Sequence, residues 1–212
     1  MFNVCSNCGM YSRKKSITPS PQGSFAVCLH CGHRHRFVQL PLFIVTGASG
    51  VGKSTVCLEL AARLPECVCL DCDIFWRQEF ATPEDDYRGF RNLCLRAAKN
   101  IEQNGRPVAL FGSAIPQQYE ACSERRYFSK THYLAMVCEE ETLIERLKSR
   151  PEWRKSGDTE TLQTMVRFNR WFFENAPSTQ PPMTLLDTTA LSVEQSVERV
   201  TDWIYSCLGK FV

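Results

Sequence analysis

Nine consecutive residues have the types and spacing of a phosphate-binding loop. They are Gly47, Ala48, Ser49, Gly50, Val51, Gly52, Lys53, Ser54 and Thr55. The glycines let backbone N–H groups turn toward a polyphosphate, Lys53 reaches its β- and γ-phosphates, and the hydroxyl of Ser54 is a ligand for Mg²⁺. We therefore predict that the chain binds a nucleoside triphosphate with Mg²⁺ through these residues.

The segments on both sides of this loop support the prediction. Residues 42–46 form a short apolar, β-branched run that is typical of a buried parallel strand. After Lys53, apolar residues recur with helical spacing until Pro65 ends the pattern. The loop thus joins a strand to the N-terminus of a helix, whose dipole adds to the attraction for anions.

Four cysteines near the N-terminus have the spacing of a metal site. Cys5 and Cys8 form one Cys-x-x-Cys pair, and Cys28 and Cys31 form another. Four thiolates complete the tetrahedral coordination of a structural Zn²⁺, which would hold this apolar-poor segment folded. Two disulfides, a redox dithiol, or a nearby histidine in place of one cysteine are the alternatives. We predict a Cys₄ zinc ribbon over residues 1–38.

The composition is that of a globular protein in a reducing environment. The 212 residues are enough for one ordinary domain and a small module, and 43% of them are hydrophobic. No signal-peptide pattern precedes the cysteines, and no run reaches the ~20 apolar residues of a membrane span. Of the twelve cysteines, eight lie outside the metal pattern, scattered through apolar segments. We therefore expect a cytoplasmic protein that does not contact membranes.

Charge is distributed unevenly along the chain. Residues 1–38 carry five lysines and arginines and no acidic residue, while the whole chain has a formal charge of +2. Because a zinc ion with four thiolates contributes a charge of about −2, the module stays basic and favours nucleic acid or other phosphates. A basic surface that only keeps a small module in solution is the alternative.

The remainder, residues 39–212, alternates strands and helices as parallel sheets do. The predicted strands are residues 42–46, 67–71, 107–112, 133–138 and 183–187. The predicted helices are the one after Lys53, residues 82–104, 140–149 and 160–174, and a last one after Ser192. Thr82 is the expected N-cap of the second helix, and Ser192 with Gln195 forms a capping box for the last.

Other motifs narrow the class of phosphate-loop protein. The chain has no Asn/Thr-Lys-x-Asp guanine motif, and no apolar strand is followed by Asp-Glu as in motor-type ATPases. It does have Asp71-Cys72-Asp73 at the end of a predicted strand and several arginines between residues 146 and 170. With these motifs, residues 42–208 resemble the small-molecule kinases of the P-loop class: nucleoside and nucleotide kinases, shikimate kinase and gluconate kinase.

The resemblance implies an α/β fold with a five-stranded parallel sheet in the order 2-3-1-4-5 and a mobile lid around residues 146–158. It implies that ATP and Mg²⁺ are used, and that the γ-phosphate passes to a small-molecule acceptor, with a nucleoside or nucleotide favoured. Lys53 and Asp73 are then candidate catalytic residues, with Asp73 gripping the acceptor hydroxyl and taking its proton. Asp71 would contact a metal-bound water. A turn or capping role is the alternative for Asp73.

The resemblance also assigns arginines. Arg150 and Arg154 of the lid would neutralise the transferring phosphoryl group, with Arg146 on the same helix face as Arg150. Arg88 and Arg91 on the second helix, and Gly112 at the end of the third strand, would lie at the acceptor. An exposed basic face is the alternative for the arginines. The aromatic run Phe168, Trp171, Phe172 and Phe173 is more typical of a core than of a nucleobase site.

A rival hypothesis is that the chain binds ATP but does not transfer its phosphate. The protein would be an ATP-binding switch or adaptor whose basic ribbon binds nucleic acid or a protein partner. It predicts salt-sensitive binding that is lost when Cys5 and Cys8 are changed. A kinase acting on nucleic-acid ends would combine both hypotheses.

Overall fold

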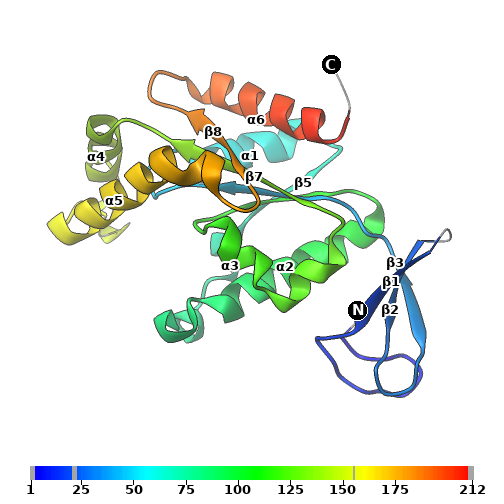
Figure 1. The fold of residues 1–212 in the computed structure, drawn as a ribbon. Helices are drawn as coiled ribbons and strands as arrows, with labels where there is room; N and C mark the ends of the chain where they lie inside the picture. The colour runs from blue at the N-terminus through cyan, green and yellow to red at the C-terminus, as the bar shows by residue number, and fades with distance from the viewer. Residues whose placement is uncertain (1–2, 21–22, 155, 210–212) are drawn as a thin grey trace.

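The computed structural model of the chain describes residues 3–20, 23–154 and 156–209. It shows a small antiparallel ribbon at the N-terminus beside a larger α/β domain (Figure 1). The described part of the chain contains no helix that is both long enough and apolar enough to span a membrane.

The ribbon is a meander of three strands, β1 (Ser16–Ser20), β2 (Gly23–Val27) and β3 (Arg34–Phe37), in that spatial order. One Cys-x-x-Cys pair precedes β1 and the other lies between β2 and β3. The small apolar cluster of the ribbon is completed from outside, because Ala26 and Phe37 pack against Tyr127 of the larger domain.

The larger domain is built on five parallel strands in the order β5-β6-β4-β7-β8. Their bounds are β4 (Leu42–Thr46), β5 (Val68–Asp71), β6 (Val108–Phe111), β7 (Thr131–Val137) and β8 (Met183–Asp187). Counted from β4, this order is 2-3-1-4-5, so the predicted fold and strand order are confirmed. All of β4 is buried at the centre of the sheet, as its continuous apolar run predicts.

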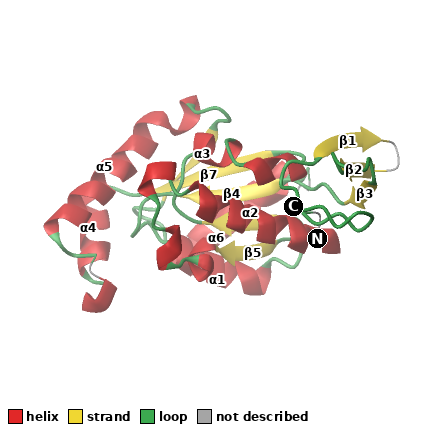
Figure 2. Cartoon of the chain, turned by 90° about the horizontal axis from the view of Figure 1, so that it is seen from below, coloured by secondary structure: helices red, strands yellow, loops and turns green. Residues whose placement is uncertain are grey.

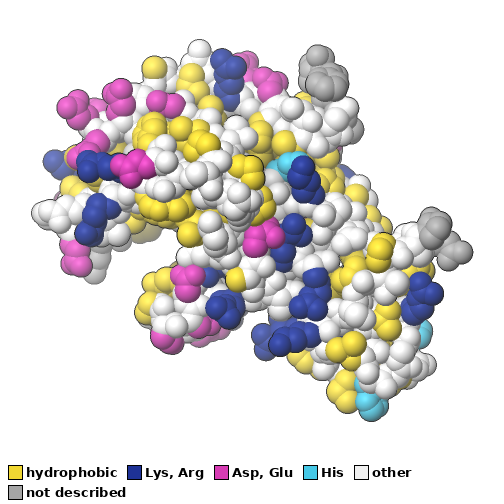
Figure 3. Space-filling model, viewed as in Figure 1, with side chains coloured by type: hydrophobic (Ala, Val, Ile, Leu, Met, Phe, Trp, Pro, Cys, Tyr) yellow, Lys and Arg dark blue, Asp and Glu magenta, His cyan; other side chains and the backbone are white. Residues whose placement is uncertain are grey.

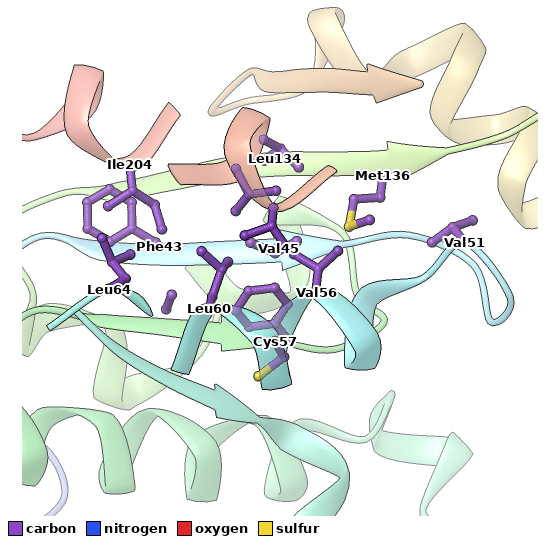
Figure 4. Packing of buried hydrophobic residues seen from close by; sticks show 14 of the residues in the cluster. Phe43, Val45, Val51, Val56, Cys57, Leu60, Leu64, Leu134, Met136 and Ile204 are labelled. Atoms are coloured by element: carbon purple, nitrogen blue, oxygen red, sulfur yellow. The ribbon is translucent and has the colours of Figure 1, made fainter. Parts of the chain in front are cut away.

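Helices cover both faces of the sheet (Figures 1 and 2). The flanking helices are α1 (Lys53–Arg63), α2 (Arg88–Ile101), α3 (Pro116–Glu120), α4 (Glu140–Lys148), α5 (Thr159–Asn175) and α6 (Val193–Cys207). Successive residues of β4 alternate between two cores. Phe43 and Val45 pack with α1 and α6, as Figure 4 shows, whereas Leu42 and Ile44 pack with α2 and α5.

The predicted second helix starts later than expected. Thr82 precedes a 3₁₀ turn at Pro83–Asp85 and its side chain caps no backbone N–H, so the N-cap prediction is wrong. Asp86 and Tyr87 then have φ angles of 55° and 53°, which interrupt helical hydrogen bonding, and α2 begins only at Arg88. The capping box of Ser192 and Gln195 at α6 is confirmed.

Candidate active site

The phosphate-binding loop joins β4 to α1 and is held by its neighbours. Gly47 has a φ of 144°, and a Cβ there would collide with the carbonyl oxygen of Met136 on β7. A Cβ at Gly50 would lie 2.8 Å from Cδ1 of Leu143 on α4. Ala48 and Val51 are buried in the core, so the loop is fixed from beneath while its other face lines a cavity.

Lys53, the first residue of α1, points back over the loop. Its Nζ donates hydrogen bonds to the carbonyl oxygens of Gly47 and Ala48, at 2.8 and 2.9 Å. Burial lowers the pKa of Lys53 to about 8, and nearby Asp73 opposes this shift while Arg150 adds to it. The amine is therefore held where phosphate oxygens would replace the two carbonyls.

The loop, the ends of β5 and β6 and the lid segment enclose a cavity of about 370 Å³. Most of the predicted site residues line it: Ser49, Gly50, Gly52, Lys53, Ser54, Thr55, Asp71, Asp73, Gly112, Arg150 and Arg154. The parallel sheet brings them together because the carboxyl ends of its strands meet at one edge.

The two aspartates at the end of β5 have different surroundings. Asp71 caps the following 3₁₀ turn, since its Oδ1 accepts a hydrogen bond from the backbone N–H of Asp73 at 3.0 Å. The capping role thus falls to Asp71. Burial and the charge of Asp71 raise the pKa of Asp73, against the opposing charges of Lys53, Arg154 and Arg150. A carboxyl with a raised pKa among cations is suited to accept a proton.

A magnesium ion would find suitable donors in this cavity. Mg²⁺ takes oxygen ligands and usually binds through one or two protein groups, phosphates and waters. The Ser54 hydroxyl and the Asp71 carboxylate line the same cavity as Lys53. This donor set fits Mg²⁺ bound together with a triphosphate.

The lid arginines separate into two groups. Helix α4 ends at Lys148, so Arg150 does not continue the helix face of Arg146, and that prediction is wrong. Arg146 instead donates to the Oγ1 and the carbonyl oxygen of Thr188, at 3.2 and 3.0 Å. Arg150 and Arg154 enter the loop cavity from the segment after α4. Residue 155 of the predicted lid lies outside the described residues.

Two further cavities share lining residues with the loop cavity. One of about 300 Å³ shares Gly50, Gly52, Thr55 and Arg150 with it, and continues past Arg146 toward α6. The other, of about 350 Å³, shares Ser113 with it and continues between α2, α3 and α5. We call these the donor-side and acceptor-side cavities.

The acceptor-side cavity combines aromatic rings with a polar network. Arg91 is only 5% exposed, and it donates hydrogen bonds to the carboxylate and the carbonyl oxygen of Asp86. The side-chain amide of Gln118 donates to both carboxylate oxygens of Asp86, at 2.8 and 3.0 Å. The Nε of Arg91 is buried without a hydrogen-bond partner in the described structure. Rings of Tyr87, Phe168 and Trp171 complete the walls. An unpaired buried donor marks a site that a ligand could satisfy.

Arg88 and Gly112, which were predicted to lie at the acceptor, do not line the acceptor-side cavity. Arg88 does not line the three adjoining cavities and faces a separate cavity beside the ribbon. Gly112 does line the loop cavity, but a Cβ there would also lie 3.2 Å from the Cβ and Sγ of Cys72. Its small size therefore serves the packing of β6 against Cys72.

Several lining residues were not predicted from the sequence. Ser113 follows Gly112 directly, and it links the loop cavity to the acceptor-side cavity. Asp86 and Tyr87 lay inside the predicted second helix, where their left-handed conformation had no sequence signal. Phe168 and Trp171 do pack against the cores, as expected, but they also line the cavity.

The four ribbon cysteines converge on one point. All four Sγ atoms lie within 4.8 Å of one another, with 3.7 Å from Cys5 to Cys31 and 3.8 Å from Cys8 to Cys28. Tetrahedral Zn–S bonds of about 2.3 Å place sulfurs about 3.8 Å apart, so the cluster fits a zinc ion. These separations are far longer than the ~2.05 Å of a disulfide bond. We expect a zinc ion at such a closed site to be structural.

We expect Cys5→Ser/Cys8→Ser to abolish zinc binding and to destabilise the ribbon. Without the metal, little apolar burial holds the ribbon against Tyr127, and the loss should amount to several kcal/mol of folding free energy. Zinc content by mass spectrometry and thermal unfolding measure it. Cys69→Ser/Cys207→Ser, which removes two cysteines outside the cluster, should retain one zinc per chain. Zinc retained by the first variant would contradict the assignment.

Comparisons with known proteins agree with this geometry. A family model described as an AAA domain matches residues 44–165. A sugar kinase from a Janibacter species superposes with a TM-score of 0.58 at 20% identity, covering 78% of this chain and 94% of that one. A gluconokinase from Sinorhizobium meliloti gives 0.51 at 18% identity, covering 78% and 96%. A thymidylate kinase from Candida albicans gives 0.53 at 14% identity, covering 82% and 94%.

At these identities the likeness establishes a shared fold, that of the P-loop kinases. The three structures carry names with different acceptors, so the fold alone does not select a substrate. A comparison with curated proteins finds no match to this chain.

Proposed function

Since the chain belongs to the AAA-domain family and has the fold of P-loop kinases, we propose that it transfers the γ-phosphate of ATP to a nucleoside or nucleotide with the help of Mg²⁺. The observation that carries this proposal is that the phosphate-loop cavity adjoins two others. It shares Gly50, Gly52, Thr55 and Arg150 with the donor-side cavity and Ser113 with the acceptor-side cavity. A donor and an acceptor could thus meet at Lys53.

Six residues of the loop cavity have parts in this transfer. Lys53 exchanges its two carbonyl partners for oxygens of the β- and γ-phosphates. Arg150 and Arg154 neutralise charge that develops on the moving phosphoryl group. Ser54 and Asp71 hold Mg²⁺, which supplies further charge neutralisation. Asp73 orients an acceptor hydroxyl and takes its proton; with a phosphate acceptor, it acts by positioning alone.

The placement of the carboxylates favours transfer over hydrolysis. Strand β6, next to β4, ends at Phe111 and continues into Gly112 and Ser113, so no carboxylate follows it to activate a water. Asp71 instead ends β5 and Asp73 follows it, one strand further from the loop. Asp73 therefore serves an acceptor better than it serves a hydrolytic water.

The acceptor-side cavity supports a nucleobase-containing acceptor. Tyr87, Phe168 and Trp171 offer flat apolar surfaces, on which a base stacks. The buried Nε of Arg91, which has no hydrogen-bond partner among the described residues, offers a polar group to its edge. A sugar acid alone would leave the aromatic walls unused.

The test is ADP release from ATP and Mg²⁺ across a panel of nucleosides, nucleoside monophosphates, sugars and sugar acids. We expect strong stimulation by one nucleoside or nucleotide, and Tyr87→Ala should raise its KM about tenfold while the KM for ATP stays unchanged. Stimulation by sugar acids alone would reject the nucleobase assignment. A flat panel with tight ATP binding would reject the kinase and favour the ATP-binding switch.

A further inference from the structure

A large cavity lies between the ribbon and the larger domain, apart from the three adjoining cavities. Its volume is about 890 Å³. The ribbon contributes Tyr11, Arg13 and Lys14 to its walls, and the larger domain contributes Arg88 and Arg126. None of these five residues lines the loop, donor-side or acceptor-side cavity. The proposed transfer reaction leaves this junction cavity without a role.

The junction cavity is lined by four cationic side chains, one of which, Arg126, donates to the carbonyl oxygens of Ser123 and Lys15. Among the described residues, Arg13, Lys14, Arg88 and Arg126 form no ion pair. The acidic residue in its wall, Glu120, is engaged by Arg125 at 2.9 Å and by the hydroxyl of Tyr133 at 2.8 Å. Figure 3 shows lysine and arginine side chains gathered where the ribbon meets the larger domain. Four such cations attract a polyanion.

The two walls of the junction cavity are fixed to each other. Buried Lys99 on α2 pairs with buried Glu124, and Asn3 of the ribbon bonds to both, at 3.0 Å from Lys99 and 3.2 Å from Glu124. The rings of Phe37 and Tyr127 pack edge to face across the same junction, at 5.6 Å. The cavity is therefore preformed, and a ligand would spend little free energy on ordering it.

We propose that the junction cavity binds the sugar–phosphate backbone of single-stranded nucleic acid. The unpaired cations suit successive phosphates, while Tyr11, 51% exposed, and Leu29, 67% exposed, offer surfaces for bases beside them. An acidic peptide would use the cations but not these surfaces. The cavity lies between the ribbon and the larger domain, and such a site admits a single strand more readily than a duplex.

The bound strand would lie next to the proposed catalytic site. Arg88 of the junction cavity directly follows Tyr87, which lines the acceptor-side cavity. Binding in the junction cavity nevertheless stands apart from the transfer reaction, because none of the four cations lines the loop cavity. Lys53→Ala should therefore leave nucleic-acid binding unchanged, and this separates the two proposals.

The experiment is fluorescence anisotropy of a labelled twelve-nucleotide oligothymidylate with the zinc-loaded full chain, from 50 to 300 mM salt. We expect micromolar binding at 50 mM and a slope of log K against log salt of about −3, since each phosphate contact adds about −0.7. Arg13→Gln/Lys14→Gln should weaken binding about tenfold and bring the slope to about −1.5. Both side chains belong to exposed residues, so the variant should fold.

The matched control is Arg167→Gln/Arg199→Gln, which removes the same charge from exposed residues on α5 and α6. This control should bind the oligonucleotide like the unaltered protein. If both double variants weaken oligonucleotide binding equally, binding depends only on the net charge of the protein, and the proposal is overturned. Absence of binding at 50 mM salt would overturn it too, as would equal competition by a polyglutamate peptide of the same charge.

Discussion

Lys53→Ala should lower phosphoryl transfer by at least about 10³-fold while the protein stays folded. The Nζ of Lys53 is hydrogen-bonded to Gly47 and Ala48 of its own loop, and in the complex it would pair with the β- and γ-phosphates. Its removal leaves charge on the transferring group uncompensated inside the cavity. Initial rates of ADP formation with the acceptor found in the panel measure the effect, and circular dichroism verifies the fold.

Lys130→Ala is the matched control, because Lys130 is an exposed lysine just before β7 and outside the three adjoining cavities. It should retain full activity. Full activity in the Lys53→Ala protein would eliminate the proposed transfer site.

The pKa of Lys53 gives this prediction a second readout. Burial lowers that pKa to about 8 in the free protein, whereas bound phosphates favour the protonated amine and raise it. Binding of ATP above pH 8 therefore takes up a proton, so the affinity should fall as the pH rises from 8 toward 9.5. In Lys53→Arg the guanidinium stays protonated, and the affinity should stay level over that range.

The sheet was predictable because each of its strands is a short apolar run that can be recognised in the sequence. The alternating strands and helices predict a parallel sheet, and the resemblance to P-loop kinases implies its strand order. The predicted strands 42–46 and 183–187 coincide with β4 and β8. The start of α2 was not predictable in the same way. Thr82-Pro83 followed by acidic residues is a good helix start by residue type, but the hydrogen bonds of Asp86 to Arg91 and Gln118 hold a left-handed turn instead.

The candidate site was predictable only where one segment supplies it. Lys53, Ser54 and the glycines are contiguous, so their spacing identifies them. The acceptor-side cavity draws on residues 86–91, 113–118 and 168–171, and no spacing rule joins segments so far apart. The contact between the ribbon and the larger domain could not be predicted either, because Lys99 and Glu124 are residue types expected at the surface. They are buried because they pair with each other and with Asn3.

Asp73→Asn should lower kcat by roughly 10²- to 10⁴-fold with an alcohol acceptor, with little change in ATP affinity. Asn keeps the shape and a hydrogen-bonding oxygen but cannot take the hydroxyl proton. Partial burial and the charge of Asp71 raise the pKa of Asp73, so kcat/KM of the unaltered protein should fall as the pH is lowered through that raised pKa. The rate over the pH range, with ATP binding measured separately, tests both statements.

The control for Asp73→Asn is Asp202→Asn, which makes the same change at an exposed position on α6. This control should leave kcat unchanged, and it should also leave unchanged the fall of kcat/KM at low pH. If Asp73→Asn lowers ATP affinity and spares kcat, Asp73 belongs to the donor and not to the acceptor. If kcat of Asp73→Asn falls only a few-fold and kcat/KM still falls at low pH, the acceptor is itself a phosphate. A phosphate oxygen that attacks ATP has no proton to lose, so it needs no base. The size of this one effect therefore separates a nucleoside acceptor from a nucleotide acceptor.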